Sequence, residues 1–191
     1  MSKLYFKFGT MNSGKTMEII RTVYNYEEVG SKILLMKPTI DTKGNDFIVA
    51  RSGLTRKVDL LVNQLDNLYE LLNKDPEVKL IKAILVDEAQ FLAEEQVDQL
   101  MQIVIDLNIT VICWGLRSDF QTKLFPGSQR LLTIAHKLEE IKTMCATGCD
   151  NKAIFNARYI NNKIVYEGEQ ICIDDKEEVA YRVLCPNCYY K

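Results

Sequence analysis

The positions of apolar residues along the chain predict an α/β fold. Short apolar segments recur between polar turns, as expected of buried strands. These segments lie at residues 3–8, 32–38, 81–86, 109–114 and 138–144. Helical periodicity predicts helices at residues 17–26, 60–72, 94–107 and 128–135. Strands that alternate with helices favour a parallel sheet with right-handed crossovers and helices on both faces.

The pattern changes after residue 144, which predicts two domains, an α/β domain at 1–144 and a small one at 145–191. In the second part, two extended runs flank Asn161-Asn162 and predict a hairpin or a long loop. Within the first domain, residues 47–51 are expected to form a short edge strand. Ser128 is expected to cap the helix that follows it.

The loop between the first strand and the first helix carries a phosphate-binding signature. Residues 9–16 read GTMNSGKT, which matches G-x-x-x-x-G-K-[ST]. The expected phosphate-binding residues are Gly9, Thr10, Met11, Asn12, Ser13, Gly14, Lys15 and Thr16. Lys15 can reach the outer phosphates of a nucleotide, and the Thr16 hydroxyl can bind Mg²⁺. The alternative is a glycine-rich turn before an ordinary helix, but the flanking strand and helix favour a P-loop NTPase-like sheet.

The strand at 81–86 runs directly into two acids, Asp87 and Glu88. A carboxylate at the end of such a strand holds Mg²⁺ in nucleotide sites, usually through water. Glu88 can then act as a general base, on water in an ATPase or on a substrate hydroxyl in a small-molecule kinase. The spacing alone does not choose between these reactions, and a helix-capping acid is the simpler alternative.

Four cysteines form two close pairs that have the spacing of a tetrahedral zinc site. They are Cys145, Cys149, Cys185 and Cys188. A C-terminal ribbon of this size buries little core, so bound zinc would supply stability. Four reduced cysteines without metal are the alternative. The two other cysteines, Cys113 and Cys172, are expected to be small buried residues.

Composition narrows the function classes further. Hydrophobic residues make up 47% of the 191-residue chain, the net charge is −2 and the sequence pI is about 5.6. This charge argues against a nucleic-acid partner. No apolar run approaches the ~20 residues of a membrane span, and the N-terminal segment lacks the apolar core of a signal peptide. A cytoplasmic protein without membrane or nucleic-acid partners is expected, with cysteines that do not form disulfides.

Together these motifs resemble the zinc-containing thymidine kinase family of bacteria, animals and poxviruses, over nearly the whole chain. The loop at 9–16 resembles the phosphate loop of the family, and DEAQF at 87–91 resembles its acid motif. GLRSDF at 115–120 resembles its thymine-pocket loop. EGEQ at 167–170, with Tyr181, resembles the lasso that covers the substrate. The four paired cysteines fall where the family binds zinc. Lys43, however, stands where many members carry Arg, and Asp174-Asp175 replace the usual glycines.

The resemblance implies ATP-dependent phosphorylation of the 5′-hydroxyl of thymidine, and of deoxyuridine, in pyrimidine deoxynucleoside salvage for DNA synthesis. It implies that Glu88 is the general base, that Asp87 binds Mg²⁺ with Thr16, and that Asp87 and Gln90 join the ATP-binding residues. The implied nucleoside contacts are Met11, Phe91, Leu116, Phe120, Phe155, Asn156 and Tyr181, with main-chain groups near Phe155 and Asn156 bonding the pyrimidine. A homotetramer and feedback inhibition by dTTP are implied as well.

Two other functions remain to be weighed. One is a nucleotide-switched or zinc-ribbon protein that binds nucleic acid, but residues 167–181 are rich in acids and carry Lys176 as their only base. The other is a plain ATPase, in which water replaces the nucleoside as acceptor. The two functions can be distinguished experimentally, because a kinase consumes ATP only when a nucleoside is present and a plain ATPase does not need one.

Overall fold

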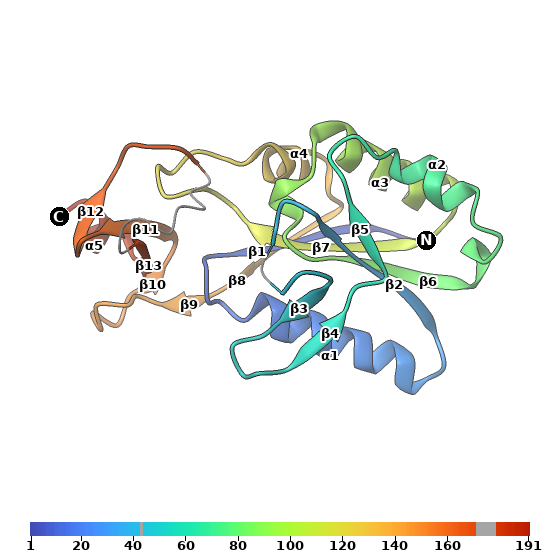
Figure 1. Ribbon diagram of the computed structural model, residues 1–191, viewed down its shortest axis with the longest axis horizontal. Coiled ribbons are helices and arrows are strands. Elements are labelled where there is room, and N and C mark those ends of the chain that lie inside the picture. The colour runs from blue at the N-terminus through green and yellow to red at the C-terminus, as the bar shows by residue number, and fades with distance from the viewer. Residues whose placement is uncertain (43, 171–178) are drawn as a thin grey trace.

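The computed structural model describes residues 1–42, 44–170 and 179–191, and its centre is one parallel sheet (Figure 1). The sheet has six strands in the order β5-β2-β6-β7-β1-β8. The strands are β1 (Leu4–Gly9), β2 (Lys32–Pro38), β5 (Leu60–Val62), β6 (Ile81–Val86), β7 (Thr110–Leu116) and β8 (Lys137–Ile141). Every pairing in it is parallel. The predicted α/β architecture is therefore confirmed.

Helices cover both faces of the sheet (Figure 1). The helices are α1 (Lys15–Glu28), α2 (Leu68–Asn73), α3 (Glu94–Asp106) and α4 (Pro126–Ile134), with 3₁₀ turns at Val78–Leu80 and Ala89–Phe91. On one face α1 packs Ile19 and Val23 against Trp114. On the other face α3 buries Val97 and Leu100 in the larger core cluster, because its apolar residues recur at helical spacing.

The helix predicted at 60–72 is wrong in its first half. Residues Leu60–Val62 form β5, which pairs with the end of β2. The helix begins only after Asn67, whose side chain accepts a hydrogen bond from the Glu70 N–H. Leucines at both ends of this stretch mimic one long helical face, and pairing with β2 overrides that local pattern.

Three smaller expectations are also corrected. Residues Phe47–Val49 form β3, but β3 pairs with β4 (Thr55–Lys57) in a separate hairpin instead of lying at the edge of the main sheet. The helix expected from Ser128 begins at Pro126, and the Ser128 hydroxyl donates to the Leu116 carbonyl (2.5 Å) instead of capping. The last sheet strand, β8, stops before 144, and β9 (Thr143–Met144) pairs with β10 (Lys152–Ala153).

The C-terminal residues form a small antiparallel sheet at one end of the molecule (Figure 1). Its strands are β11 (Phe155–Ile160), β12 (Lys163–Val165) and β13 (Val179–Leu184), followed by helix α5 (Pro186–Tyr189). Asn161 and Asn162 both have positive φ and form the tight turn of the predicted β11–β12 hairpin. Lys43, Cys172 and Asp174-Asp175 lie outside the described residues.

Candidate active site

Two glycines shape the loop between β1 and α1. Gly14 has φ of +90°, which strains residues with a side chain. A Cβ on Gly9 would lie 2.6 Å from the Ile141 carbonyl oxygen of β8, so only glycine fits between these strands. The loop therefore closes tightly around the start of α1, where free N–H groups and the helix dipole favour an anion.

Lys15 is almost buried beneath this loop. Its Nζ donates to the Thr10 carbonyl (2.7 Å), and burial lowers the pKa of Lys15 although the carboxylates of Glu88 and Asp87 oppose that shift. Among the residues that the structure describes, the buried hydroxyls of Thr10 and Ser13 have no hydrogen-bond partner. A bound phosphate would supply the acceptors that these donors lack.

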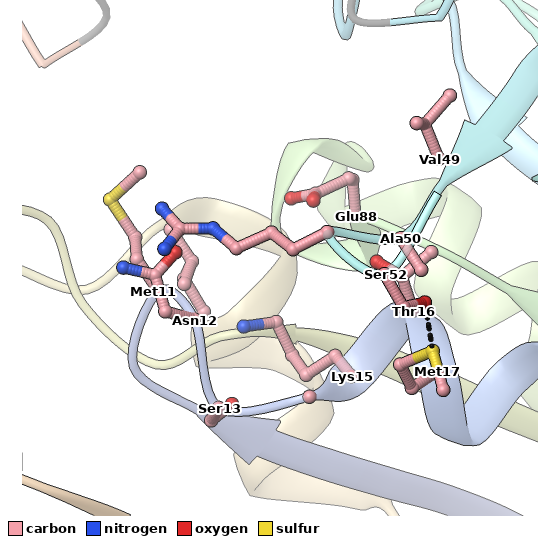
Figure 2. A pocket seen from close by; sticks show the side chains of 13 residues that line it. Met11, Asn12, Ser13, Lys15, Thr16, Met17, Val49, Ala50, Ser52 and Glu88 are labelled. Carbon is pink, nitrogen blue, oxygen red and sulfur yellow. Dashed lines mark hydrogen bonds between the residues drawn. The ribbon is translucent and has the colours of Figure 1, made fainter. Parts of the chain in front are cut away.

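A cavity of about 200 Å³ opens above the loop. It is lined by residues 11–17 of the loop and α1, by residues 49–52 at the tip of the β3–β4 hairpin, and by Glu88 and Leu116. Figure 2 shows Lys15 pointing into this space, with Glu88 on the far side. Among the expected phosphate-binding residues, 11–16 line this cavity directly.

Asp87 lies at the carboxyl end of β6 and is only 3% exposed. Its N–H donates to the Met36 carbonyl (3.0 Å), and one carboxylate oxygen accepts the Glu88 N–H (2.9 Å). Burial, and then the neighbouring charge of Glu88, raise the pKa of Asp87 to about 8. A buried carboxylate beside a phosphate loop has the donor chemistry that Mg²⁺ requires, because a cation compensates the charge that burial disfavours.

Glu88 is held in an uncommon backbone conformation, with φ of 50°. Its carboxylate accepts a hydrogen bond from the fully buried Gln90 side chain (Nε2 to Oε2, 2.5 Å), and Oε1 of Gln90 accepts the Leu116 N–H (3.0 Å). A Cβ at Gly115 would lie 2.7 Å from that Gln90 oxygen, so glycine leaves the room that Gln90 needs. The side chain of Gln90, which is expected among the ATP-binding residues, contacts Glu88.

A second cavity of about 320 Å³ lies on the other side of Glu88. Its lining consists of Met11, Asp41, Glu88, Gln90, Phe91, Leu116, Asp119, Phe120, Phe125, Asn156, Gln170 and Tyr181. The structure thus brings together six of the seven residues expected to contact a nucleoside. Met11, Glu88 and Leu116 line both cavities, so the Glu88 carboxylate lies where the two spaces adjoin.

The side chains of two expected contacts bind to other parts of the protein. The Asn156 side chain accepts the Met11 N–H (2.8 Å) and donates to the Ser118 carbonyl (3.1 Å), which ties β11 to the phosphate loop. The Phe155 ring is absent from the cavity lining and packs on Tyr189, with ring centroids 4.8 Å apart.

Sequence reasoning did not single out several residues that lie in or behind these two cavities. The hairpin tip at 49–52 carries no motif, and Asp119 and Gln170 are joined by a hydrogen bond (3.0 Å) across a long sequence separation. Arg158, buried behind the second cavity, looks like an ordinary polar position in an alternating strand. Asp119 and Gln170 fall within the segments that resemble the thymine-pocket loop and the lasso. No local signal identifies residues 49–52 or Arg158, because their neighbours come from distant segments.

The four paired cysteines meet as predicted. Their sulfur atoms all lie within 4.8 Å of one another, and Cys149 Sγ is 3.6 Å from the sulfurs of both Cys185 and Cys188. A tetrahedral zinc ion with Zn–S bonds of ~2.3 Å places sulfurs about 3.8 Å apart. The Cys185 N–H donates to Cys145 Sγ (3.3 Å), a second-layer contact that suits a thiolate. The cluster therefore fits a structural zinc ion.

The family model described as thymidine kinase matches residues 2–189. The chain belongs to the thymidine kinase family. A thymidine kinase of Streptococcus pyogenes serotype M3 (strain MGAS315) is 40% identical over 193 residues, covering 100% of this chain and 98% of the relative. Thymidine kinases of Lactococcus lactis subsp. lactis and Streptococcus gordonii are 40% and 41% identical over 192 residues, covering all of this chain and 98% and 97% of the relatives.

Membership of this family over the full chain makes the protein an enzyme of the thymidine kinase class, as its motifs predict. In the described part of the chain, no helix combines the length and apolar character that crossing a membrane requires.

Proposed function

We propose that the protein transfers the γ-phosphate of ATP to the 5′-hydroxyl of thymidine, for pyrimidine deoxynucleoside salvage. The observation that carries the proposal is the place of Glu88 where two cavities adjoin, one lined by the phosphate loop and the other by aromatic residues. A base at that junction can reach an acceptor hydroxyl while the donor phosphates occupy the loop. The relatives are named thymidine kinases, which favours thymidine as the acceptor.

On the donor side, the loop N–H groups and Lys15 bind the β- and γ-phosphates. Thr16 and Asp87 would hold Mg²⁺, which would neutralise charge on the phosphates when bound. Lys15 is pre-oriented by its bond to the Thr10 carbonyl. These groups act by positioning and electrostatic stabilisation, which account for most of the catalysis of phosphoryl transfer by proteins.

On the acceptor side, Glu88 accepts the proton of the 5′-hydroxyl as its oxygen bonds to the γ-phosphorus and the bond to the β-phosphate oxygen breaks. The products are ADP, thymidine 5′-phosphate and a proton on Glu88. Side chains of Met11, Phe91, Leu116, Phe120 and Tyr181 surround the nucleoside, and main-chain groups near Phe155 and Asn156 bond the pyrimidine edge. Deoxyuridine should also react, because one missing methyl group changes specificity only about 10- to 200-fold.

Four wider features are part of the proposal. Residues 1–144 bind the nucleotide, and residues 145–191 form a zinc-stabilised unit that covers the nucleoside. A homotetramer and feedback inhibition by dTTP rest on the family resemblance alone, and a cytoplasmic location rests on the sequence pattern described above. Light scattering after size-exclusion chromatography tests the tetramer, and inhibition at micromolar dTTP tests the feedback.

The deciding experiment offers γ-labelled ATP and Mg²⁺ to the enzyme with thymidine, deoxyuridine, deoxycytidine or no acceptor. We expect label on thymidine and deoxyuridine, and a loss of about 10²- to 10⁴-fold in kcat for Glu88→Gln. Label released as inorganic phosphate whatever nucleoside is present would instead identify an ATPase. Near-normal transfer by Glu88→Gln would remove Glu88 as the base.

A further inference from the structure

Arg158 is the only arginine among the buried polar residues of the described chain, and it is 3% exposed. It lies on β11 directly opposite Tyr181 of β13. Its guanidinium carbon is 3.7 Å from the centroid of the Phe120 ring, which is close stacking between two planar groups. Phe120 belongs to the loop that follows β7, so this contact joins the C-terminal sheet to the main domain.

The edge of the same guanidinium makes three hydrogen bonds. Nε donates to the Tyr181 hydroxyl (2.8 Å), Nη1 to the Glu169 carbonyl (2.8 Å) and Nη2 to the Gln170 carbonyl (3.2 Å). Within residues 1–42, 44–170 and 179–191, no carboxylate oxygen lies within 4 Å of Arg158. Among the described residues, the partners of this buried charge are neutral acceptors and a ring, and burying a charge is costly in itself.

The groups that Arg158 holds are walls of the nucleoside cavity. Phe120, Tyr181 and Gln170 line that cavity, whereas Arg158 lies behind them and is not part of its lining. Further bonds join the same segments, since Gln170 Nε2 donates to Asp119 (3.0 Å) and Gln121 Nε2 donates to the Gly168 carbonyl (2.8 Å). Arg158 contacts all three of these walls.

We propose that Arg158 is a positioning residue that fixes Phe120, Tyr181 and residues 169–170 around the nucleoside, and so determines nucleoside affinity without touching the substrate. The proposal rests on the proposed function, which assigns this cavity to the nucleoside. A lysine in its place keeps the charge but loses the planar fork that serves one ring and three acceptors together. The donor cavity has no contact with Arg158, so ATP binding should not depend on it.

The test is Arg158→Lys, with Arg182→Lys as the matched control. Arg182 lies on β13 of the same small sheet and also stacks on a ring, 4.7 Å from the centroid of Tyr159, but it lines neither cavity. For Arg158→Lys we expect the KM for thymidine to rise about tenfold or more, equivalent to about 1.4 kcal/mol. The KM for ATP should stay within about twofold and kcat within about threefold. Arg182→Lys should behave as the unmodified enzyme.

Calorimetric titration of thymidine into each variant separates affinity from kinetics, since KM equals Kd only when chemistry is slow. A second variant, Tyr181→Phe, removes the acceptor of Arg158 Nε and keeps the ring. If Arg158 acts partly through Tyr181, the double variant should lose less affinity than the product of the two single losses.

An unchanged thymidine KM in an active Arg158→Lys enzyme would overturn the inference and leave the proposed function standing. So would equal losses of ATP and thymidine affinity, which indicate general damage. If the affinity loss of the double variant equals the product of the two single losses, Arg158 does not act through Tyr181. If the unmodified enzyme phosphorylates no nucleoside, the proposed function fails and this inference fails with it.

Discussion

At the scale of single residues, the turn after β6 concentrates features that stability alone disfavours. Asp87 is buried with its pKa raised to about 8, and Glu88 has a left-handed backbone conformation. Lys15 is largely shielded from solvent. Such strain and buried charge are typical of functional sites, where they place reactive groups in advance.

The contact of Gln90 with Glu88 leads to the first prediction. Gln90→Met keeps the length of the side chain but removes the donor to Glu88 and the acceptor for the Leu116 N–H. We expect kcat to fall about 10- to 100-fold with little change in the KM for ATP, because a misplaced base costs on this order. Steady-state kinetics measures both.

Gln99→Met is the control, because Gln99 also accepts a backbone N–H, that of Leu68 (2.8 Å), yet lines neither cavity. It should lower stability without lowering kcat. A Gln90→Met enzyme with normal kcat would show that Glu88 needs no such support.

The raised pKa of Asp87 predicts how stability varies with pH. The ordinary pKa is 3.8 and the folded value is about 8, so between these values the folded protein holds a proton that the unfolded chain has released. Stability from this group is then lost as pH rises from about 4 to 8. Asp87→Asn should remove that loss, so the Mg²⁺-free variant should unfold at a higher temperature than the unmodified protein at pH 8, by about 2–4 °C for each kcal/mol recovered.

Thermal unfolding with a chelator present, at pH 5 and pH 8, measures the difference. The advantage of Asp87→Asn should be larger at pH 8, while its kinase activity should be lost. An identical pH dependence in both proteins would mean that the Asp87 carboxyl is not the group responsible.

At the scale of elements, the sequence predicts those parts whose signal is local. The phosphate loop is one continuous motif, and the central strands are continuous apolar runs because both of their faces are buried. Leu60–Val62 could not be recognised as a strand, since its three residues continue the leucine spacing of the helix after it. Its pairing with β2 is a property of the tertiary fold.

The same reasoning separates the predictable from the unpredictable parts of the site. Asp87 and Glu88 follow a buried strand and can be found by position. Arg158 and Arg51 cannot be found in this way, because the residues around them come from segments that are far away in sequence. Periodicity and spacing do not reveal such contacts. The family resemblance supplied most of the expected nucleoside contacts, whereas the side-chain partners of Gln90, Asn156 and Phe155 come from the structure alone.

The β3–β4 hairpin carries the third prediction. Ile48 packs in the core cluster beside α1, and Arg56 pairs with Glu27 of α1 (2.7 Å), so the hairpin is held against that helix. Its tip places exposed Arg51 at the donor cavity (Figure 2 labels its neighbours Ala50 and Ser52). Arg51→Ala should raise the KM for ATP about tenfold through a lost charge-assisted bond to phosphate, with thymidine KM unchanged.

Initial-rate kinetics over both substrates tests this prediction, with Lys57→Ala as control. Lys57 is an exposed cation of the same hairpin, paired with Asp46 (3.5 Å), and it lies outside both cavities. Equal effects of the two substitutions would indicate general electrostatics and not a specific contact.

At the scale of the whole molecule, the cysteine cluster and the nucleoside cavity are mechanically connected. Tyr189, the residue after Cys188, donates its hydroxyl to the Phe120 carbonyl (2.5 Å) and lies buried in the C-terminal core. Phe120 in turn lines the nucleoside cavity. A change that destabilises α5 should therefore affect nucleoside binding more strongly than binding at the phosphate loop.

Loss of zinc is the test of that connection. Cys188→Ser removes one of four ligands, so we expect zinc content measured by mass spectrometry to fall and the thermal midpoint to drop, because metal binding supplies folding energy to small units. The KM for thymidine should rise at least about tenfold while the KM for ATP changes far less. Cys113→Ala, in the core of β7 and away from the cluster, should keep its zinc and its thymidine KM although it loses stability. A zinc-free Cys188→Ser enzyme with unchanged thymidine KM would show that the C-terminal unit and the nucleoside cavity are independent, because the path through Tyr189 and Phe120 would then transmit nothing.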